Sequence, residues 1–216
     1  MDSYKTPLGE IKITVIGHAS LLVEWNGKYI YSDPYSEAGD FSGREKADLI
    51  LITHNHYDHY DESAWSKIVT DKTLFVVSQD VGKVSDRYVV LKNGESYNYE
   101  GLMIHAVHAY NVNRRNDAGE LFHPRGVGNG YVLDFGGFRL YIAGDTEPIP
   151  EMRHVTNIDI AFLPKNLPYT MTDEEFVQVA NTIRPKYLYP IHYFELDVAK
   201  LIGMLDTGIT MIVNNK

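Results

Sequence analysis

The sequence contains no cysteine among its 216 residues. Disulfide frameworks, thiolate nucleophiles, cysteine-bound zinc and iron–sulfur clusters are therefore excluded. The sequence also lacks an apolar run of 18 residues, so no segment is expected to span a bilayer as a helix. Its first ten residues contain no basic region followed by an apolar run, so we expect no signal peptide in this chain and a cytoplasmic location.

Positive charge is scarce, with 20 Lys and Arg against 29 Asp and Glu, which gives a net charge of −9. This balance disfavours broad nucleic-acid binding and docking on anionic membranes, because both depend on clustered cations. Hydrophobic residues make up 44% of the chain and charged residues 23%, as in ordinary folded proteins. Because no repeat or linker divides the sequence, we expect one domain over residues 1–216; the sequence leaves homo-oligomerisation open.

Short β-strands dominate the secondary structure predicted for the first half. Asn26-Gly27 lies between two apolar runs and predicts a tight hairpin turn. Asp61 to Val69 has helical spacing with acidic residues in its first turn, which predicts a helix. The expected strands are Ile11 to Val15, Leu21 to Trp25, Tyr29 to Tyr31, Asp48 to Thr53, Leu74 to Val77 and Tyr88 to Leu91.

The second half repeats this mixture of strands and helices. Thr172, followed three residues later by Glu175, forms a capping-box pattern and predicts a helix over Thr172 to Ile183. A further helix is expected over Leu196 to Leu205. The expected strands are Gly101 to Ala109, Tyr131 to Phe135, Phe138 to Ala143, Ile158 to Leu163, Tyr187 to Ile191 and Thr210 to Val213. The pattern indicates two packed sheets with helices outside and leaves their topology open.

Three histidines and an aspartate lie within six residues, directly after the apolar run that ends at Thr53: His54, His56, Asp58 and His59. On an extended loop, His54 and His56 can point the same way and share one ion. Asp58 and His59 follow where the chain begins to turn, so they can face a second ion. Imidazole and carboxylate ligands together favour zinc, iron or manganese over calcium. A solvated loop with surface histidines is the alternative.

This cluster resembles the H-x-H-x-D-H signature of the metallo-β-lactamase superfamily. Asp145 in Gly144-Asp145-Thr146 is similar to the superfamily's strand-end aspartate, and His192 matches its late histidine. Within the superfamily, the sequence looks most like the branch of ascorbate-phosphate lactonase and N-acylphosphatidylethanolamine-hydrolysing phospholipase D. The shorter motifs that support this branch are Ile16 to Ser20, Ser32-Asp33-Pro34, and Thr172 with Glu174 and Glu175.

The resemblance implies an α/β fold, an αββα sandwich of two mixed sheets flanked by helices, with two metal ions at one edge. The implied ligands are His54 and His56 with a third histidine for the first ion, Asp58, His59 and His192 for the second, and Asp145 as the bridge between them. The implied cofactors are two divalent transition-metal ions, zinc foremost, with manganese or iron as alternatives. The implied activity is hydrolysis of an ester, lactone or phosphodiester by metal-bound hydroxide.

The third histidine is where this sequence departs from the pattern. Relatives in this branch carry Pro-Ala-x-His, whereas the run here is His108-Ala109-Tyr110-Asn111, which puts Asn111 at the ligand position. Asparagine binds zinc poorly compared with imidazole. His108, upstream at a strand end, and His123, on a loop that can fold over the site, are both candidate metal ligands. We favour His123 because a flexible loop can reach where a strand side chain cannot.

Three further residues complete the expected site. We expect His18 to lie beside the metals and to act with Asp58 as a catalytic residue; the alternative is a hydrogen-bonded buried histidine next to a turn. The segment from Asn111 to Gly130 looks like a long active-site loop. Within it, Asn111 and Arg125 are expected to bind substrate, with Arg125 clamping a phosphate or carboxylate, unless its charge is simply solvated.

Two other classes of function remain open at the sequence level. One is iron-dependent redox chemistry on the same scaffold. The other is a non-catalytic domain that binds a metal or ligand, which the departure at Asn111 would favour. The expected partner is a small-molecule or lipid-like ester or phosphoester substrate, and nucleic acid is not expected because of the acidic balance.

Overall fold

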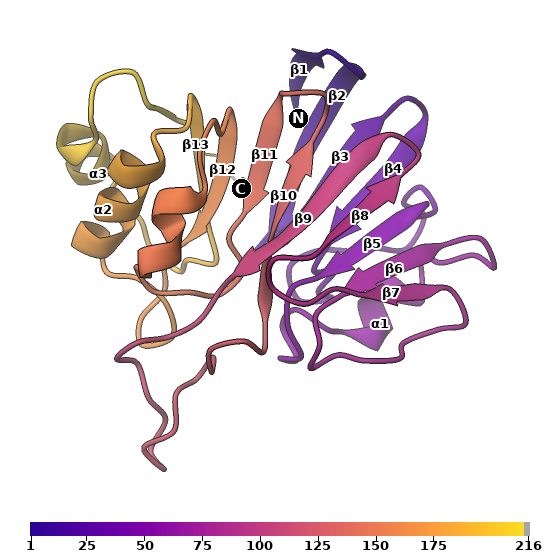
Figure 1. Ribbon diagram of the computed structural model, residues 1–216, viewed down its shortest axis with the longest axis horizontal. Helices are drawn as coiled ribbons and strands as arrows, with labels where there is room; N and C mark the ends of the chain where they lie inside the picture. Colours follow the sequence, from indigo (N-terminus) through magenta and orange to yellow (C-terminus); the bar gives the residue numbers. More distant parts are fainter. Residues whose placement is uncertain (214–216) are drawn as a thin grey trace.

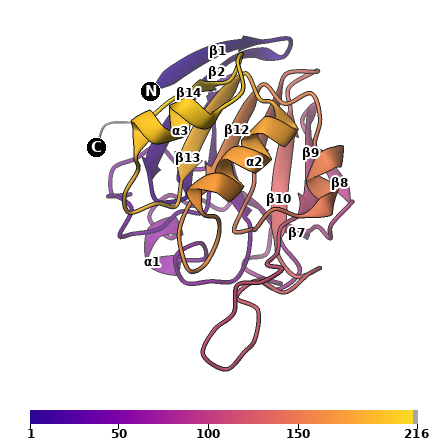
Figure 2. The ribbon, with the colours of Figure 1, turned by 90° about the vertical axis from the view of Figure 1, so that its left-hand side faces the viewer.

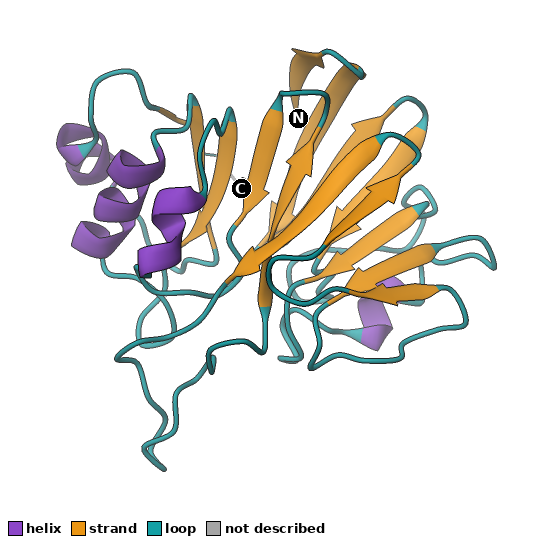
Figure 3. Ribbon diagram, viewed as in Figure 1, coloured by secondary structure: helices purple, strands orange, loops and turns teal. Residues whose placement is uncertain are grey.

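The computed structural model describes residues 1–213, which form two mixed β-sheets that face each other (Figures 1 and 3). In each sheet the strands lie side by side in chain order. The strands of the first sheet are β1 (Asp2–Thr6), β2 (Gly9–Gly17), β3 (Ser20–Trp25), β4 (Lys28–Ser32), β5 (Leu49–Ile52), β6 (Leu74–Val77) and β7 (Tyr88–Val90). Those of the second are β8 (Ser96–Tyr99), β9 (Leu102–His108), β10 (Asn129–Asp134), β11 (Arg139–Ile142), β12 (Ile160–Pro164), β13 (Tyr187–Ile191) and β14 (Thr210–Met211).

Both sheets are built on the same plan. Strands β1 to β4 and β8 to β11 are antiparallel meanders, whereas β4 to β7 and β11 to β14 run parallel. The parallel part of each sheet directs the carboxyl ends of neighbouring strands to one edge. Loops that leave these strands therefore gather at the same edge of the molecule, where an α/β protein builds its site.

Apolar side chains fill the space between the two sheets. Strand β5 (LILI) is buried on both faces: Leu49 and Leu51 point into the space between the sheets, and Ile50 and Ile52 point outward. From the second sheet, Phe162 packs into the same core and stacks on Tyr189 with ring centroids 4.8 Å apart. Burial on both faces explains why the sequence of β5 is continuously apolar rather than alternating.

Helices cover the outer face of the second sheet (Figure 2). They are the 3₁₀ helix η1 (Pro150–His154), α2 (Asp173–Ile183) and α3 (Val198–Met204). On the first sheet, the outer face packs against the single turn of α1 (Glu62–Trp65) and against loop residues such as Phe41. The αββα order expected from the resemblance is therefore confirmed, with a thin outer layer on one side. No helix of residues 1–213 is long and apolar enough to cross a membrane.

Most of the expected elements are present, but η1 was not expected and three other elements differ from the prediction. The helix expected over Asp61 to Val69 ends at Trp65, because the β-branched run after it has low helix propensity and the Ile68 carbonyl accepts a hydrogen bond from Ala47 instead. Strands β1 and β8 were not expected. Their polar sequences, DSYKT and SYNY, pair at sheet edges, where half the side chains face solvent and leave little apolar signal.

Removal of the α2 cap should destabilise the protein measurably. The Glu175 backbone N–H donates to the Thr172 hydroxyl over 3.2 Å, and the Thr172 N–H donates to the Glu175 carboxylate over 2.9 Å. We expect Thr172→Ala to lower the free energy of unfolding by about 1 kcal/mol in urea titrations. Thr182→Ala, on the exposed face of the same helix, is the control. Equal losses in the two variants would contradict a specific role for the cap.

Candidate metal centre

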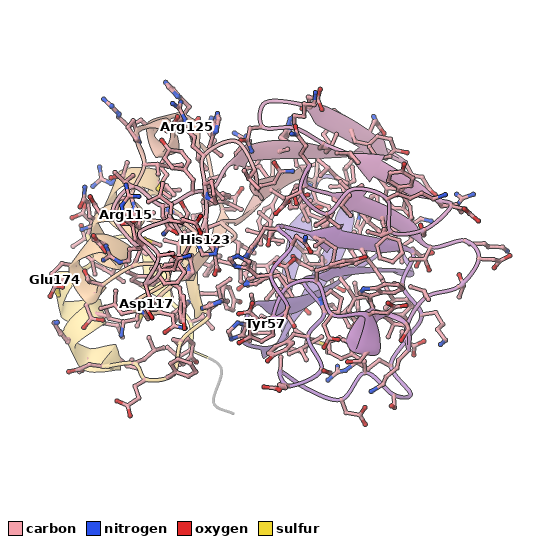
Figure 4. The ribbon with its side chains drawn as sticks, turned by 90° about the horizontal axis from the view of Figure 1, so that it is seen from below. Tyr57, Arg115, Asp117, His123, Arg125 and Glu174 are labelled. Atoms are coloured by element: carbon pink, nitrogen blue, oxygen red, sulfur yellow. The ribbon has the colours of Figure 1, made fainter. Side chains whose placement is uncertain are left out.

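Titratable side chains from both sheets converge at the edge where the parallel strands end. His54 to His59 follow β5, Asp145 follows β11 and His192 follows β13. The His192 backbone N–H donates to the His18 carbonyl over 2.9 Å, which ties the two sheets together here. Viewed from below, His123 and Tyr57 lie near the centre of the molecule, on the two sides of this junction (Figure 4).

The backbone at this edge is unusual for non-glycine residues. Seven non-glycine residues in the range 1–213 have positive φ, and three of them are here: His18 (φ 50°), Asp33 (φ 44°) and His192 (φ 52°). Gly144 adds a fourth positive φ, 64°, and a Cβ at this position would lie 2.7 Å from the Asn129 carbonyl oxygen. Such conformations cost free energy and concentrate at functional sites.

Three imidazole nitrogens form the first half of the cluster. His56 Nδ1 lies 3.1 Å from His54 Nε2 and 3.2 Å from His123 Nε2. Tetrahedral zinc with Zn–N bonds of about 2.05 Å would separate its ligand nitrogens by about 3.3 Å. The spacing of these three nitrogens therefore suits one tetrahedral ion.

Asn111 fixes the orientation of the third histidine. Its side-chain N–H donates to the Tyr169 carbonyl over 2.9 Å, and its Oδ1 accepts the His123 backbone N–H over 2.8 Å. The same oxygen lies 2.6 Å from His123 Nδ1, so that nitrogen must carry the proton. The lone pair of His123 is therefore on Nε2, which faces the other two histidines, and the asparagine at position 111 holds the ring in this orientation.

Asp33 plays the same part for two other histidines. Its carboxylate accepts the His59 Nδ1–H over 2.9 Å and the Thr53 hydroxyl over 2.7 Å. The Thr53 oxygen in turn lies 3.1 Å from His54 Nδ1. Both rings thus present Nε2 to the cluster. The sequence shows Asp33 only as part of a short strand-end motif, and nothing in that motif indicates which ring it holds.

The second half of the cluster centres on two carboxylates. His192 Nε2 lies 3.3 Å from Asp58 Oδ2 and 3.2 Å from Asp145 Oδ2, and His59 Nε2 lies 3.4 Å from Asp145 Oδ1. Asp145 also reaches the first group, because its Oδ2 is 3.4 Å from His123 Nε2. This buried carboxylate therefore lies between the two groups, in the place of a bridging ligand.

His18 belongs to the second group as well. Its Nε2 lies 3.0 Å from Asp58 Oδ2, and its ring centroid is 3.9 Å from that of His192. One ligand atom each from His18, Asp58, His59 and His192 lies within 4.8 Å of the others, as do those of His54, His56 and His123. Burial lowers the pKa of His18, so we take the ring as neutral with its Nε2–H donated to Asp58.

The protein alone leaves some ligand atoms of this cluster without partners, and bound metal ions would supply them. Within residues 1–213, three buried atoms of the cluster have no hydrogen-bond partner: His59 Nε2, His192 Nε2 and Asp145 Oδ1. Unpartnered buried polar atoms are costly and rare in folded proteins. Burial also lowers the pKa of His54 and His56, which favours the neutral imidazole that binds metals.

Charge at Asp145 and Asp58 is maintained despite burial. Burial by itself would raise both pKa values, but His192 and His59 hold the pKa of Asp145 well below its usual value. The hydrogen bond from His18 and the nearby His192 ring hold the pKa of Asp58 below its usual value in the same way. Both side chains are therefore carboxylates at neutral pH, the form in which they can bind cations.

Two of the residues expected at the site lie elsewhere. Among the described residues, His108 is in none of the clustered groups; its ring contacts Tyr110 at the end of β9. Arg125, expected to bind substrate, donates to Glu151 over 2.6 Å and lies over the Tyr110 ring, with 64% of its side chain exposed. Figure 4 shows it displaced from His123. The expectation that Arg125 clamps the substrate finds no support in this arrangement.

A buried glutamate anchors the loop that carries His123. Glu147 is 1% exposed and accepts the backbone N–H groups of Val112 and Asn113, each over 2.8 Å, and that of Arg114 over 2.9 Å. The Arg114 guanidinium donates to the same carboxylate over 2.8 Å and to Glu175. The loop projects from the lower edge in Figure 1 but is fixed at its base. Sequence analysis did not identify Glu147.

Asn111 variants should affect one metal site and leave the other intact. We expect Asn111→Ala to weaken one of the two zinc-binding steps by about 10- to 100-fold, because His123 loses the acceptor that orients it. Asn111→Asp keeps an acceptor oxygen and should restore binding. Isothermal titration with zinc measures both steps, and Asn113→Ala, on the same loop, is the control. Unchanged binding in Asn111→Ala, with an unchanged melting temperature, would contradict the assignment of His123.

Comparison with known proteins identifies the family of this chain. A family profile described as "Beta-lactamase superfamily domain" matches residues 12–192. A UPF0173 metal-dependent hydrolase of Thermus thermophilus is 31% identical over 193 residues, which cover 85% of this chain and 84% of the relative.

Solved structures give the same result. A crystal structure from Parabacteroides distasonis, of a protein assigned as a metal-dependent hydrolase, is 43% identical with a TM-score of 0.91 and covers 98% of this chain and 96% of its own. A metallo hydrolase from Ignicoccus hospitalis is 22% identical with a TM-score of 0.72, covers 95% of this chain and 96% of its own, and shares the fold. The chain therefore belongs to the beta-lactamase superfamily, as a hydrolase of the metallo-β-lactamase fold.

Proposed function

We propose that the protein binds two divalent transition-metal ions, zinc foremost, and uses them to hydrolyse an ester, lactone or phosphodiester. His54, His56 and His123 would hold the first ion; Asp58, His59 and His192 would hold the second, and Asp145 would bridge the two. The observation that carries the proposal is Asp145, a buried carboxylate that lies 3.4 Å from His123 and 3.2 Å from His192. The relatives' description as metal-dependent hydrolases supports the same assignment.

Two bound cations would lower the pKa of a shared water and polarise the bond to be cleaved. The chain itself contributes orientation and proton handling. Asn111 and Asp33 accept the Nδ1–H groups of His123 and His59, and so hold both rings with Nε2 toward the cluster. His18 holds the Asp58 carboxylate through its Nε2–H.

His18 also lines the cleft beside the cluster, together with His56, Asp58 and His192. The Asp58 carboxylate there can accept a proton from the attacking water, and the neutral His18 ring hydrogen-bonded to it can pass a proton on to the departing group of a substrate. We therefore assign His18 and Asp58 to proton transfer, with Asp58 also a ligand of the second ion.

Metal content is the first test. Protein purified without added metal should contain close to two equivalents of transition metal per chain by elemental analysis, and a chelator should abolish turnover, which added zinc should restore. A visible absorption spectrum typical of iron, with oxygen-dependent turnover and no hydrolysis, would favour redox chemistry instead. Metal binding without any turnover would favour a binding domain.

Asp58→Asn should separate chemistry from folding. The substitution keeps the shape of the side chain but removes the charge that His18 and His192 contact. We expect kcat/KM to fall by at least about a hundredfold, with loss of one metal equivalent and a melting temperature within a few degrees of the native value. Asp86→Asn, on an exposed loop with 99% of the Asp86 side chain accessible, is the control. Full turnover by Asp58→Asn would refute the proposal.

A further inference from the structure

An open cleft of about 600 Å³ lies beside the metal-ligand cluster. Its wall includes His18, His56, Asp58, His123 and Asp145, so a molecule bound in the cleft would touch the candidate centre directly. This volume is within the range of pockets that hold small organic ligands. The chemistry of the rest of the wall therefore indicates what kind of substrate fits.

Aromatic side chains form most of that remaining wall: Tyr35, Tyr57, Phe122, Tyr169, Tyr193 and Phe194. Tyr35 and Tyr57 meet edge to face with ring centroids 6.1 Å apart, and Phe122 and Tyr169 do so at 4.9 Å. The two pairs come from different halves of the chain. They bring apolar surface to the cleft from both sheets' loops.

Several of these rings are exposed to an extent that packing does not require. Four aromatic residues are exposed in residues 1–213, and three of them line this cleft: Tyr57 at 78%, Phe194 at 81% and Tyr169 at 40%. Tyr88, on β7, is the fourth. Exposed apolar surface that gathers at one opening is typical of a binding site.

Lys and Arg side chains are absent from the same wall among the described residues. None of the described residues that line the cleft is Lys or Arg, and Glu37 adds an exposed carboxylate at its border. Arg114 is held by Glu147 and Glu175, and Arg115 donates to the Gly119 carbonyl. Lys165 lies in a neighbouring hollow, where it pairs with Asp173 over 2.7 Å. Sites that select phosphate or carboxylate groups ordinarily present such cations to them.

We propose that the substrate is an uncharged carboxylic ester or lactone with an apolar, ring-sized group that packs against these aromatic side chains. This inference rests on the proposed hydrolase function and narrows it by excluding phosphodiesters as preferred substrates. In the reaction, the oxygen of water bonds to the acyl carbon and the acyl C–O bond breaks. One proton of the water goes to the departing alcohol oxygen, and the carboxylic acid that forms loses its own proton to solvent.

Esters with one leaving group test the charge and the apolar group separately. We expect the zinc-loaded protein to cleave para-nitrophenyl phenylacetate with a kcat/KM about tenfold above that for the acetate. The kcat/KM for para-nitrophenyl butyrate should exceed that for the anionic para-nitrophenyl hydrogen succinate by about the same factor. Glu37→Lys should reduce or reverse the second preference, with Glu37→Gln intermediate. A preference for the succinate in the native protein would overturn the inference.

Phe194→Ala tests the aromatic wall without disturbing the core, because the ring is 81% exposed. We expect the phenylacetate preference over acetate to fall about tenfold, with acetate turnover unchanged. Tyr88→Ala removes an exposed ring outside the cleft and should change neither rate. Equal effects of the two substitutions on the phenylacetate preference would overturn the role of the wall.

Two further measurements distinguish failure of this inference from failure of the proposed function. If bis(para-nitrophenyl) phosphate gains more rate over its uncatalysed hydrolysis than the esters do, the substrate class is wrong and the hydrolase assignment stands. If nothing is hydrolysed, the proposed function fails, and calorimetric binding decides the class. Tighter binding of phenylacetamide than of phenylphosphonate would still support an uncharged aromatic ligand; the reverse order would overturn it.

Discussion

The structure depends on one constraint, which is that buried imidazole and carboxylate groups from two sheets must satisfy one another at a single edge. Asp145 is the centre of this arrangement, because its oxygens lie within 3.4 Å of His59 after β5, His192 after β13 and His123 on the β9–β10 loop. Within residues 1–213, one of those oxygens lacks a hydrogen-bond partner. A cation in the space that this oxygen faces would offset the negative charge of the buried carboxylate, so the arrangement suits a cationic ligand.

Two aspartates at equivalent places in the two sheets help to hold the cluster. Asp33 and Asp145 follow β4 and β11, which occupy equivalent places in the two sheets, at the change from antiparallel to parallel pairing. One of the two aspartates lies within the cluster, and the other hydrogen-bonds His59 and Thr53 behind it. The shared plan of the sheets thus places one acidic group within the cluster and one behind it.

The loop between β9 and β10 combines reach with rigidity. Its tip is exposed, but Glu147 binds three consecutive backbone N–H groups at its base, and Asn111 binds His123 at its return. A histidine on a loop can therefore be as well oriented as one on a strand. The same anchoring pairs Arg114 with Glu147, so its guanidinium does not line the neighbouring cleft, whose wall is mainly aromatic.

The sequence by itself determined the local elements and the residue types of the centre. Alternation, the Asn26-Gly27 turn and the Thr172 cap depend on neighbours in the chain, and the spacing of His54, His56, Asp58 and His59 is local as well. The tertiary structure decided which side chains meet. Only folding placed His123 rather than His108 beside His56, made Asn111 its holder, gave Asp33 and Glu147 their partners and paired Arg125 with Glu151. These contacts join residues tens of positions apart, and their geometry depends on sheet order and loop paths that local periodicity does not encode.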